Sequence, residues 1–555
     1  MVSKRYFPGT LMLLILLILS LTGCQLPEGS LSGQILTKDA PSEKAEIANQ
    51  QMSAEPGWSA KKAEKITLDW YVNFAWFNTS WGENLVSKKI TEETGVDINF
   101  ITPSGNGSEK LKSLIASDTL PDILTMSWSE EAISDLIAEG DVYALDTLAD
   151  QYDLYWYQTT DPVIVDWYTN SDGHIYGYPN YALTPKDYKT YDNIPSNQTF
   201  LVRKDIYEAI GSPDMTTPEG FQAAVEKAAQ MYPKVGSEPL IAVGAHEFTD
   251  YGNVSFDEYL ANFLAIPYEK DGKFYDRYID PELIRWLKMF RVLGEKGLLS
   301  PDIFWDKRVQ MEEKIAKGRY FCMLYQYTDM ADQQRALYGN DPDSIYIAVD
   351  GPRNSLGKNP TLPGMGINGW TVTMISKNCE YPDRAIQLFS YFMSEHGQQM
   401  TWQGVEGKTW FRDENVAQLE SQWRSLLQTD RKIYDQEYGA DATYWMFSNM
   451  KYSSKGRTEK FEPVAQLKRW TYPYVFNPTP YQIILESGSQ EAIVQEKIDR
   501  EWGEVLPQLL LAASEKEFNK IWFDFIQKRN VWGVSQVLRK KTELMNDVKA
   551  KMELP

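Results

Sequence analysis

The sequence has few cysteines, few histidines and a deficit of basic residues. Three cysteines in 555 residues exclude a scaffold held together by disulfides. The three histidines, His174, His246 and His396, are widely separated and form no H-E-x-x-H zinc motif. The 56 Lys and Arg are outnumbered by 77 Asp and Glu, which gives a net charge of −21. This balance argues against a nucleic-acid partner, because such proteins need a basic surface.

Long hydrophobic runs are missing as well, apart from one near the start. Residues 11–19 are an unbroken run of Leu, Met and Ile that follows Lys4 and Arg5. Nine apolar residues are too few for a transmembrane helix, which needs about 20. The run is therefore typical of a secretory signal peptide, which we expect over residues 1–23.

The leader ends in the sequence LTGC at residues 21–24, which resembles the lipobox of bacterial lipoproteins. The resemblance implies that the thiol of Cys24 carries lipid, so that acyl chains such as palmitate anchor the protein outside the cell membrane. A chance cysteine at the end of a leader is the alternative. Residues 24–65 are rich in Ser, Ala, Glu, Lys and Gln, a composition that predicts a flexible stalk behind the anchor.

Aromatic residues are the abundant class. The chain has 18 Trp, 33 Tyr and 22 Phe, together 13% of its residues, within an ordinary 43% hydrophobic content. The overall composition is that of a globular protein. So many rings indicate either extensive aromatic packing or a site that offers rings to a ligand.

The first part of the folded body alternates predicted strands and helices. Strands are predicted over residues 66–74, 96–101 and 121–126, and helices over 83–94 and 108–117. This order predicts βαβ units and a parallel sheet. Since ligands bind outside the carboxyl ends of such strands, we expect a site around residues 73–81 and 127–128.

A second α/β unit is predicted further along the chain. Strands are predicted over residues 199–203 and 346–349, and helices over 205–210 and 216–231. A predicted strand over 370–375 and a predicted helix over 381–394 follow. Two α/β lobes crossed by a discontinuous chain explain this order. We expect lobe 1 to comprise residues 66–190 and 368–425, and lobe 2 residues 191–367 and 426–555.

Several ordered motifs resemble the extracellular solute-binding proteins of family 1, the carbohydrate-capturing lipoproteins of ABC importers. They are LPDILTMSW (120–128), DGHIYGYP (172–179), FLVRKDIYEAIG (200–211), GRYFCML (318–324) and the segment 375–410. The similarity is greatest to the long forms that bind oligosaccharides. It implies a two-lobed, periplasmic-binding-protein-like clamshell whose hinge closes on a sugar, which is then delivered to ABC transporter permease subunits. It also implies a monomer that needs no cofactor and catalyses no reaction.

Two further expectations concern metals and thiols. Some long relatives carry a calcium loop of alternating Asp and Asn, but the corresponding residues 232–238 read YPKVGSE. This stretch has no such ladder of oxygen ligands, so we expect no metal there. Cys322 lies in an apolar run, and we favour buried thiols over a disulfide between Cys322 and Cys379.

A sugar site needs flat aromatic faces for the C–H surface of the pyranose ring and planar polar groups for its hydroxyls. The loops after the predicted strands carry this mixture, as does the Gly-rich run before Trp370. Each ring has packing as its alternative role, and for Arg203 the alternative is an ion pair with Asp205. The predicted ligand-binding residues are Asn73, Trp76, Trp81, Trp128, Tyr178, Arg203, Trp370 and Trp402.

The main alternative to a binding protein is a polysaccharide-active enzyme, either a glycoside hydrolase or a lyase. The sequence has no G-x-S-x-G nucleophile motif. A glycosidase nevertheless needs only two carboxylates about 5–10 Å apart, and the 77 acidic residues leave such a pair open. A scaffold or adhesion lipoprotein is a second alternative, which would bind polymer surfaces without closing on a ligand.

Overall fold

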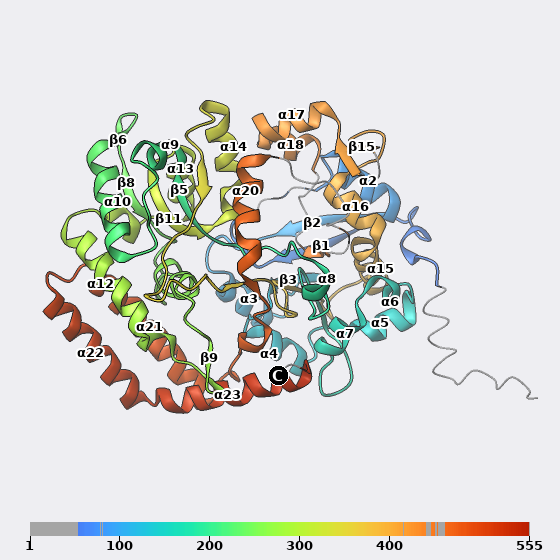
Figure 1. Cartoon of the computed structure of the whole chain (residues 1–555). Coiled ribbons are helices and arrows are strands. Elements are labelled where there is room, and N and C mark those ends of the chain that lie inside the picture. The colour runs from blue at the N-terminus through green and yellow to red at the C-terminus, as the bar shows by residue number, and fades with distance from the viewer. Residues whose placement is uncertain are drawn as a thin grey trace, which may run out of the picture. The chain divides into compact units, whose positions relative to one another are not determined.

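The chain folds into two α/β lobes, each built around its own sheet (Figure 1). This computed structural model describes residues 54–77, 79, 81–413, 416–439, 446–449, 452 and 461–553. Cys24, the predicted signal peptide and most of the predicted stalk lie outside these residues. Within the described part of the chain, every helix is too short or too polar to cross a bilayer.

The first lobe contains a five-stranded sheet in the order β2-β1-β3-β14-β4. β1, β2 and β3 run parallel, whereas β14 is antiparallel to both of its neighbours. The elements of this lobe are β1 (Ile66–Val72), α2 (Leu85–Thr94), β2 (Val96–Ile101), α3 (Gly107–Ala116), β3 (Ile123–Ser127), α4 (Ala132–Ala138), α5 (Leu145–Tyr152), α6 (Trp156–Thr159), α7 (Pro162–Tyr168), β4 (Gly177–Pro179), β14 (Thr371–Ile375), α15 (Pro382–Met393) and α16 (Glu395–Gln403).

The second lobe contains a four-stranded sheet in the order β12-β5-β11-β8. β5 is antiparallel to β11 and β12, and β8 is parallel to β11. The elements are β5 (Gln198–Arg203), α9 (Lys204–Ala209), α10 (Pro218–Met231), β8 (Ile241–Gly244), α11 (Leu260–Phe263), α12 (Pro281–Glu295), α13 (Arg308–Ala316), β11 (Tyr320–Gln326), α14 (Ala331–Asn340), β12 (Tyr346–Ala348) and α20 (Glu462–Thr471).

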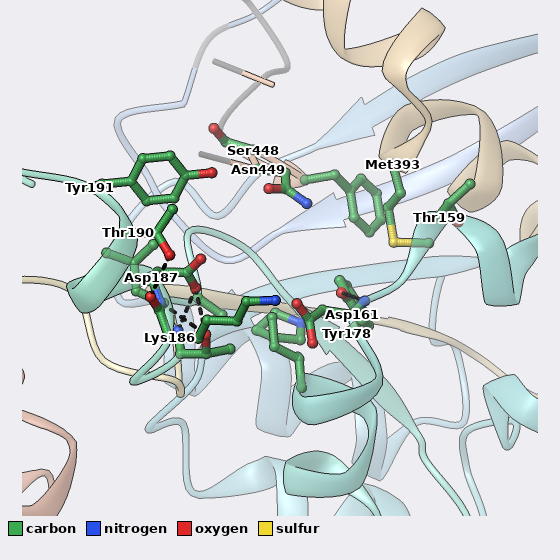
Figure 2. Close-up of a pocket in the computed structure, with 16 residues that line it drawn as sticks. Thr159, Asp161, Tyr178, Lys186, Asp187, Thr190, Tyr191, Met393, Ser448 and Asn449 are labelled. Carbon is green, nitrogen blue, oxygen red and sulfur yellow. Dashed lines mark hydrogen bonds between the residues drawn. The ribbon is translucent and has the colours of Figure 1, made fainter. Parts of the chain in front are cut away.

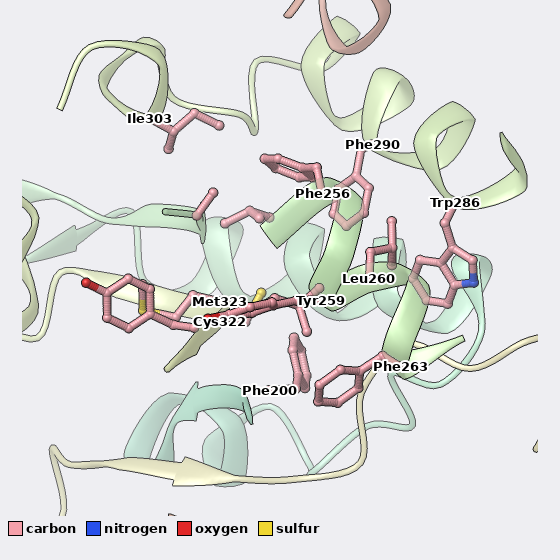
Figure 3. Close-up of a cluster of buried hydrophobic side chains, with 14 of the residues drawn as sticks. Phe200, Phe256, Tyr259, Leu260, Phe263, Trp286, Phe290, Ile303, Cys322 and Met323 are labelled. Carbon is pink, nitrogen blue, oxygen red and sulfur yellow. The ribbon is translucent and has the colours of Figure 1, made fainter. Parts of the chain in front are cut away.

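The core of the second lobe is rich in aromatic rings. Phe290 contacts Phe221 and Phe256 edge to face, with ring centroids 5.5 and 4.9 Å apart. Figure 3 shows Phe256 and Phe290 in this core, with Trp286 of α12 and Cys322 in the same cluster. Cys322 lies in this core and Cys379 in the core of the first lobe, and both are buried thiols without a disulfide, as the sequence analysis favoured.

Three long helices follow in the last described part of the chain: α21 (Gln490–Leu510), α22 (Glu515–Trp532) and α23 (Val534–Lys551). Their inner side chains join the core of the second lobe. The buried ion pair between Arg529 and Asp276 (2.7 Å) anchors α22 to that lobe. At the end of α23, Lys551 donates to the backbone oxygen of Trp167, 3.1 Å away at the end of α7. The C-terminal helices therefore contact both lobes.

Most predicted elements of the first lobe are present within a few residues of their expected bounds. α2 ends where expected, at Gly95, whose φ of 74° is the left-handed conformation that glycine adopts at low cost. The parallel sheet predicted for the first three strands is confirmed for β1, β2 and β3. β14 joins this sheet antiparallel to both β3 and β4, because the chain enters it in the opposite direction after it returns from the second lobe.

The predicted lobe boundary near residue 426 differs from the packing. Leu427, Tyr434, Tyr438 and Phe447 lie in the core of the first lobe, although the sequence analysis assigned them to the second. They come from α17 (Ser421–Thr429), α18 (Arg431–Glu437) and the residues after them. The chain contributes to the second lobe again at α20, which packs on β12.

A buried chain of hydrogen bonds crosses the first sheet. The indole nitrogen of Trp70 in β1 donates to Oγ1 of Thr125 in β3 (2.8 Å). Thr125 in turn shares a 2.8 Å hydrogen bond with Oγ1 of Thr373 in β14. All three side chains are fully buried. Because each group finds its partner only in this alignment, the contacts favour one register of the three strands.

We expect Thr125→Val to destabilise the protein by about 1–3 kcal/mol, because it leaves the buried Trp70 N–H without an acceptor. Thr67→Val is the matched control: Thr67 is an exposed threonine in β1, and its replacement should change the free energy of unfolding by less than about 0.5 kcal/mol. Urea denaturation of both variants measures the difference. Equal stabilities would show that the hydrogen-bond chain does not constrain the sheet.

Candidate functional site

The site lies at one end of three neighbouring inner strands of the first sheet, β1, β3 and β14. Asn73 follows β1, Trp128 follows β3, and Trp370 precedes the antiparallel β14. The backbone nitrogen of Trp128 donates to the backbone oxygen of Trp370 at 3.2 Å. Residues 242 positions apart in the sequence are thereby brought side by side at the carboxyl ends of β1 and β3.

Three rings gather at this edge and form what we term the aromatic platform: Phe74, Trp76 and Trp370. The indoles of Trp76 and Trp370 are nearly parallel, with an angle of 8° between their planes and 6.0 Å between ring centroids. Phe74 lies 5.4 Å from Trp76 and 5.5 Å from Trp370. Trp76 is 44% exposed, so the platform offers an aromatic face to solvent.

Polar contacts fix the backbone next to the platform. The side-chain amide of Asn73 donates to Glu130 (3.1 Å), and its oxygen accepts from the hydroxyl of Tyr71 (2.8 Å). Ser108 also donates to Glu130 at 2.9 Å. With its amide bonded in this way, Asn73 holds the turn that carries Phe74 and Trp76.

Asn180 fixes the backbone of Trp370, just as Asn73 fixes the turn that carries Phe74 and Trp76. It is fully buried, and its backbone oxygen accepts from the backbone nitrogen of Trp370 at 2.9 Å. Its side-chain oxygen accepts from the backbone nitrogen of Ser448 at 2.6 Å. Asn180 stands at the start of the segment that leads from β4 to the second lobe, so it ties the platform to that crossover.

The second lobe brings one cation, Arg308, to the platform. The guanidinium carbon of Arg308, the first residue of α13, lies 5.9 Å from the ring centroid of Trp76. Arg308 is paired with Asp329 at 3.0 Å. Asp329 also accepts from the side chain of Gln326, the last residue of β11. The platform and the Arg308 group therefore face each other from different lobes.

The other predicted site residues have neighbours away from the platform. Trp81 donates to Oγ1 of Thr91 at 3.0 Å and contacts Phe100 and Phe392. Trp402 lies in α16, whose main neighbours are α15 and α2.

Arg203 lies at the end of β5 and is nearly buried. Its guanidinium pairs with Asp205 at 2.9 Å and donates to the backbone oxygen of Gly318. This is the ion pair that the sequence analysis named as the alternative, and it gives Arg203 a structural role in the second lobe.

Tyr178 lines a separate cavity of about 310 Å³ beside the crossover from β4 to β5 (Figure 2). The volume is at the lower end of the range for small-molecule sites, about 300–1,000 Å³. Asp187 accepts from the backbone nitrogen and hydroxyl of Thr184 (2.7 and 2.8 Å), and Asp161 caps α7. The hydroxyl of Tyr178 accepts from the backbone nitrogen of Asp161 at 3.0 Å. The lining mixes polar and apolar side chains, and the carboxylates of Asp161 and Asp187 are bonded within their own loops.

Arg308 and Asp329, the second-lobe residues beside the platform, were not among the predicted site residues. Arg308 and Asp329 carry no motif that marks them as functional. The apolar run before Gln326 was the one available signal. If it had been interpreted as a strand, residues 326–329 would have been predicted to lie at a strand end. Among the described residues, no cluster of three His, Cys, Asp or Glu side chains could hold a metal ion.

Comparison with known proteins identifies the family. Residues 79–399, more than half of the chain, match the family of bacterial extracellular solute-binding proteins. The chain belongs to this family. A comparison with curated proteins finds no match.

Several solved structures are similar to this solute-binding protein over most of its length. The Streptococcus pneumoniae ABC-transporter substrate-binding protein FusA in complex with kestose is 16% identical, with a TM-score of 0.66 and coverage of 87% of this chain and 100% of that chain. The alginate-binding protein AlgQ2 without calcium ion is 17% identical, with a TM-score of 0.63 and coverage of 89% and 100%. The N-glycan transport protein NgtS of Streptococcus pneumoniae, in complex with Man1GlcNAc, is 13% identical, with a TM-score of 0.53 and coverage of 88% and 99%. These similarities confirm the predicted two-lobed, periplasmic-binding-protein-like fold.

His246 follows β8 in this solute-binding protein and lies close enough to Arg308 to feel its charge. Its ring stacks on Tyr325 at a centroid distance of 4.3 Å, and its buried Nε2 has no hydrogen-bond partner in the described part of the chain. Burial, and secondarily the positive charge of Arg308, lower the pKa of His246 to about 3. The folded protein therefore keeps this imidazole neutral.

The pKa of His246 gives a pH dependence with a definite sign. In the unfolded chain His246 takes up a proton below about pH 6.5, whereas the folded state resists protonation down to about pH 3. Stability must therefore fall as the pH falls through this window. Between pH 8 and pH 5 we expect the wild type to lose about 1–2 kcal/mol more than His246→Phe, which has no group to protonate.

Urea denaturation of the wild type and His246→Phe at the two pH values measures this difference. Phenylalanine preserves the stack on Tyr325 and needs no partner for Nε2, so the variant should remain folded. Parallel loss of stability in both proteins would show that His246 is protonated freely in the folded state.

Proposed function

We propose that this solute-binding protein is a membrane-anchored, non-catalytic receptor that captures an oligosaccharide between its lobes and delivers it to the permease of an ABC importer. Lipidated Cys24 provides the anchor in this proposal, and residues 24–65 form the tether. The family places the protein outside the cytoplasm. The fold provides two lobes joined by crossover segments, an arrangement that permits hinge closure around a ligand.

The aromatic platform is the observation that carries the proposal. A partly exposed Trp76, backed by Trp370 and Phe74, offers a flat face to the apolar C–H surface of a pyranose ring. Arg308 and Asp329, from the other lobe, offer a donor and an acceptor for hydroxyl groups. A sugar between them would contact both lobes and so favour the closed form.

The known ligands of similar structures support a carbohydrate. One such structure is in complex with kestose, another with Man1GlcNAc, and a third is described as alginate-binding. Within the platform, Trp76, Trp370 and the neighbouring Trp128 are our proposed ligand contacts. We propose that Asn73 positions the platform instead of binding sugar itself.

We expect an oligosaccharide to raise the melting temperature of the full chain and to be recovered intact. A ligand at 100 times its Kd stabilises the native state by about 2.7 kcal/mol, which a thermal-shift screen of plant and microbial oligosaccharides detects. Chromatography of each ligand after incubation tests for cleavage. Recovery of cleaved glycan would identify an enzyme and contradict the proposal.

For an oligosaccharide found in this way, we expect Trp76→Ala to weaken binding at least about tenfold, or about 1.4 kcal/mol, because it removes the exposed face of the platform. Trp305→Ala is the control, since Trp305 is 81% exposed in the second lobe. Isothermal titration calorimetry compares the two variants. If both bound as tightly as the wild type, the platform would not be the site.

A further inference from the structure

The charges around Arg308 determine which sugars the proposed site can accept. Nε of Arg308 donates to Glu312 at 2.7 Å, and Nη2 lies 3.0 Å from Asp329. Burial acts to lower the pKa of Arg308, but Asp329 and Glu312 outweigh it and raise the pKa above its ordinary value. The guanidinium that faces Trp76 is thus already paired with two carboxylates.

Other charged groups nearby leave the balance negative. Glu247 accepts from the backbone nitrogen of Arg308 at 3.2 Å, which adds a third carboxylate to the group. On the first lobe, Glu130 lies beside the platform, bonded to Asn73. Lys307 adds a cation, but it is exposed and bonded to the backbone oxygen of Phe248 at 3.2 Å. In the described part of the chain, the four carboxylates bonded to Arg308 or Asn73 thus outnumber the cations Arg308 and Lys307.

This arrangement has opposite consequences for neutral and acidic sugars. Hydroxyl groups donate hydrogen bonds, and carboxylates such as Asp329 and Glu312 are strong acceptors for them. The carboxylate of a uronic acid would instead compete with Asp329 and Glu312 for the guanidinium. It would also be repelled by the surrounding negative charge, which is only partly screened at the boundary of the two lobes.

We propose that the site selects neutral oligosaccharides and rejects their uronic-acid counterparts, with Asp329 and Glu312 as the residues that enforce the choice. This inference rests on the proposed function, because it concerns the ligand of the same site. The two carboxylates determine specificity by occupying Arg308, which would otherwise be available to an anionic sugar.

The test compares size-matched probes by isothermal titration calorimetry with the full chain. Neutral trisaccharides (galactotriose, xylotriose, maltotriose and kestose) are titrated alongside trigalacturonate and triguluronate. We expect at least one neutral trisaccharide to bind, and every uronate to bind at least about tenfold more weakly than the tightest neutral one. A uronate that binds as tightly as the best neutral trisaccharide would overturn the inference while leaving the proposed function intact.

Two variants test the assigned cause. Asp329→Asn and Glu312→Gln each release one contact of Arg308, so we expect each to raise uronate affinity at least threefold. Because the gain comes from a newly available cation, it should shrink as salt is raised from about 0.05 to 0.5 M. Glu543→Gln is the control: Glu543 is an exposed carboxylate in α23 paired with Lys540, and this substitution should leave both classes of sugar unaffected.

The outcomes separate the two proposals. If both variants melt like the wild type but leave uronate binding unchanged, the inferred role of Asp329 and Glu312 is wrong. If the wild type and the variants bind no carbohydrate, neutral or acidic, the proposed function fails and this inference fails with it.

Discussion

The insertion of β14 into the first sheet is the constraint on which the rest of the structure depends. Thr373 in β14 shares a buried hydrogen bond with Thr125 in β3, and Thr125 accepts from Trp70 in β1. These contacts join strands from distant parts of the chain in one register. A shift of one residue would turn every side chain of β14 to the opposite face, and Trp370 would no longer lie beside Trp128.

The two-lobed arrangement and the site follow from this insertion. The chain leaves the first sheet after β4, forms the second sheet, and then returns to the first sheet as β14. The crossovers therefore begin and end next to the strand ends that carry the aromatic platform, and Asn180 holds the first of them against Trp370. Arg308 approaches Trp76 from the second lobe. Rings on one lobe and charged groups on the other suit a ligand with apolar faces and a polar edge.

Local sequence signals predicted much of the fold. The alternation of strand and helix and a glycine that ends a helix, such as Gly95, are signals contained within a few positions. They predicted nearly every strand of the first sheet. The strand ends also predicted the positions of Trp76, Trp128 and Trp370. The direction of β14, by contrast, depends on tertiary pairing with β3 and β4, for which the local sequence carries no signal.

Arg308 and Asp329 could not be predicted as site residues from the sequence, because their contacts also depend on tertiary packing. Arg308 meets Asp329 and Trp76 only through the packing of α13, β11 and the first lobe, and no spacing in the sequence reveals this. Arg203 was predicted as a ligand-binding residue, but it forms the alternative ion pair with Asp205, two residues away. The most direct test of our account is a structure of this protein with a bound neutral oligosaccharide. We expect one sugar ring over Trp76, with its hydroxyls bonded to Arg308 or Asp329. A glycan bound only in the cavity beside Asp187, with the platform uncovered, would contradict the account.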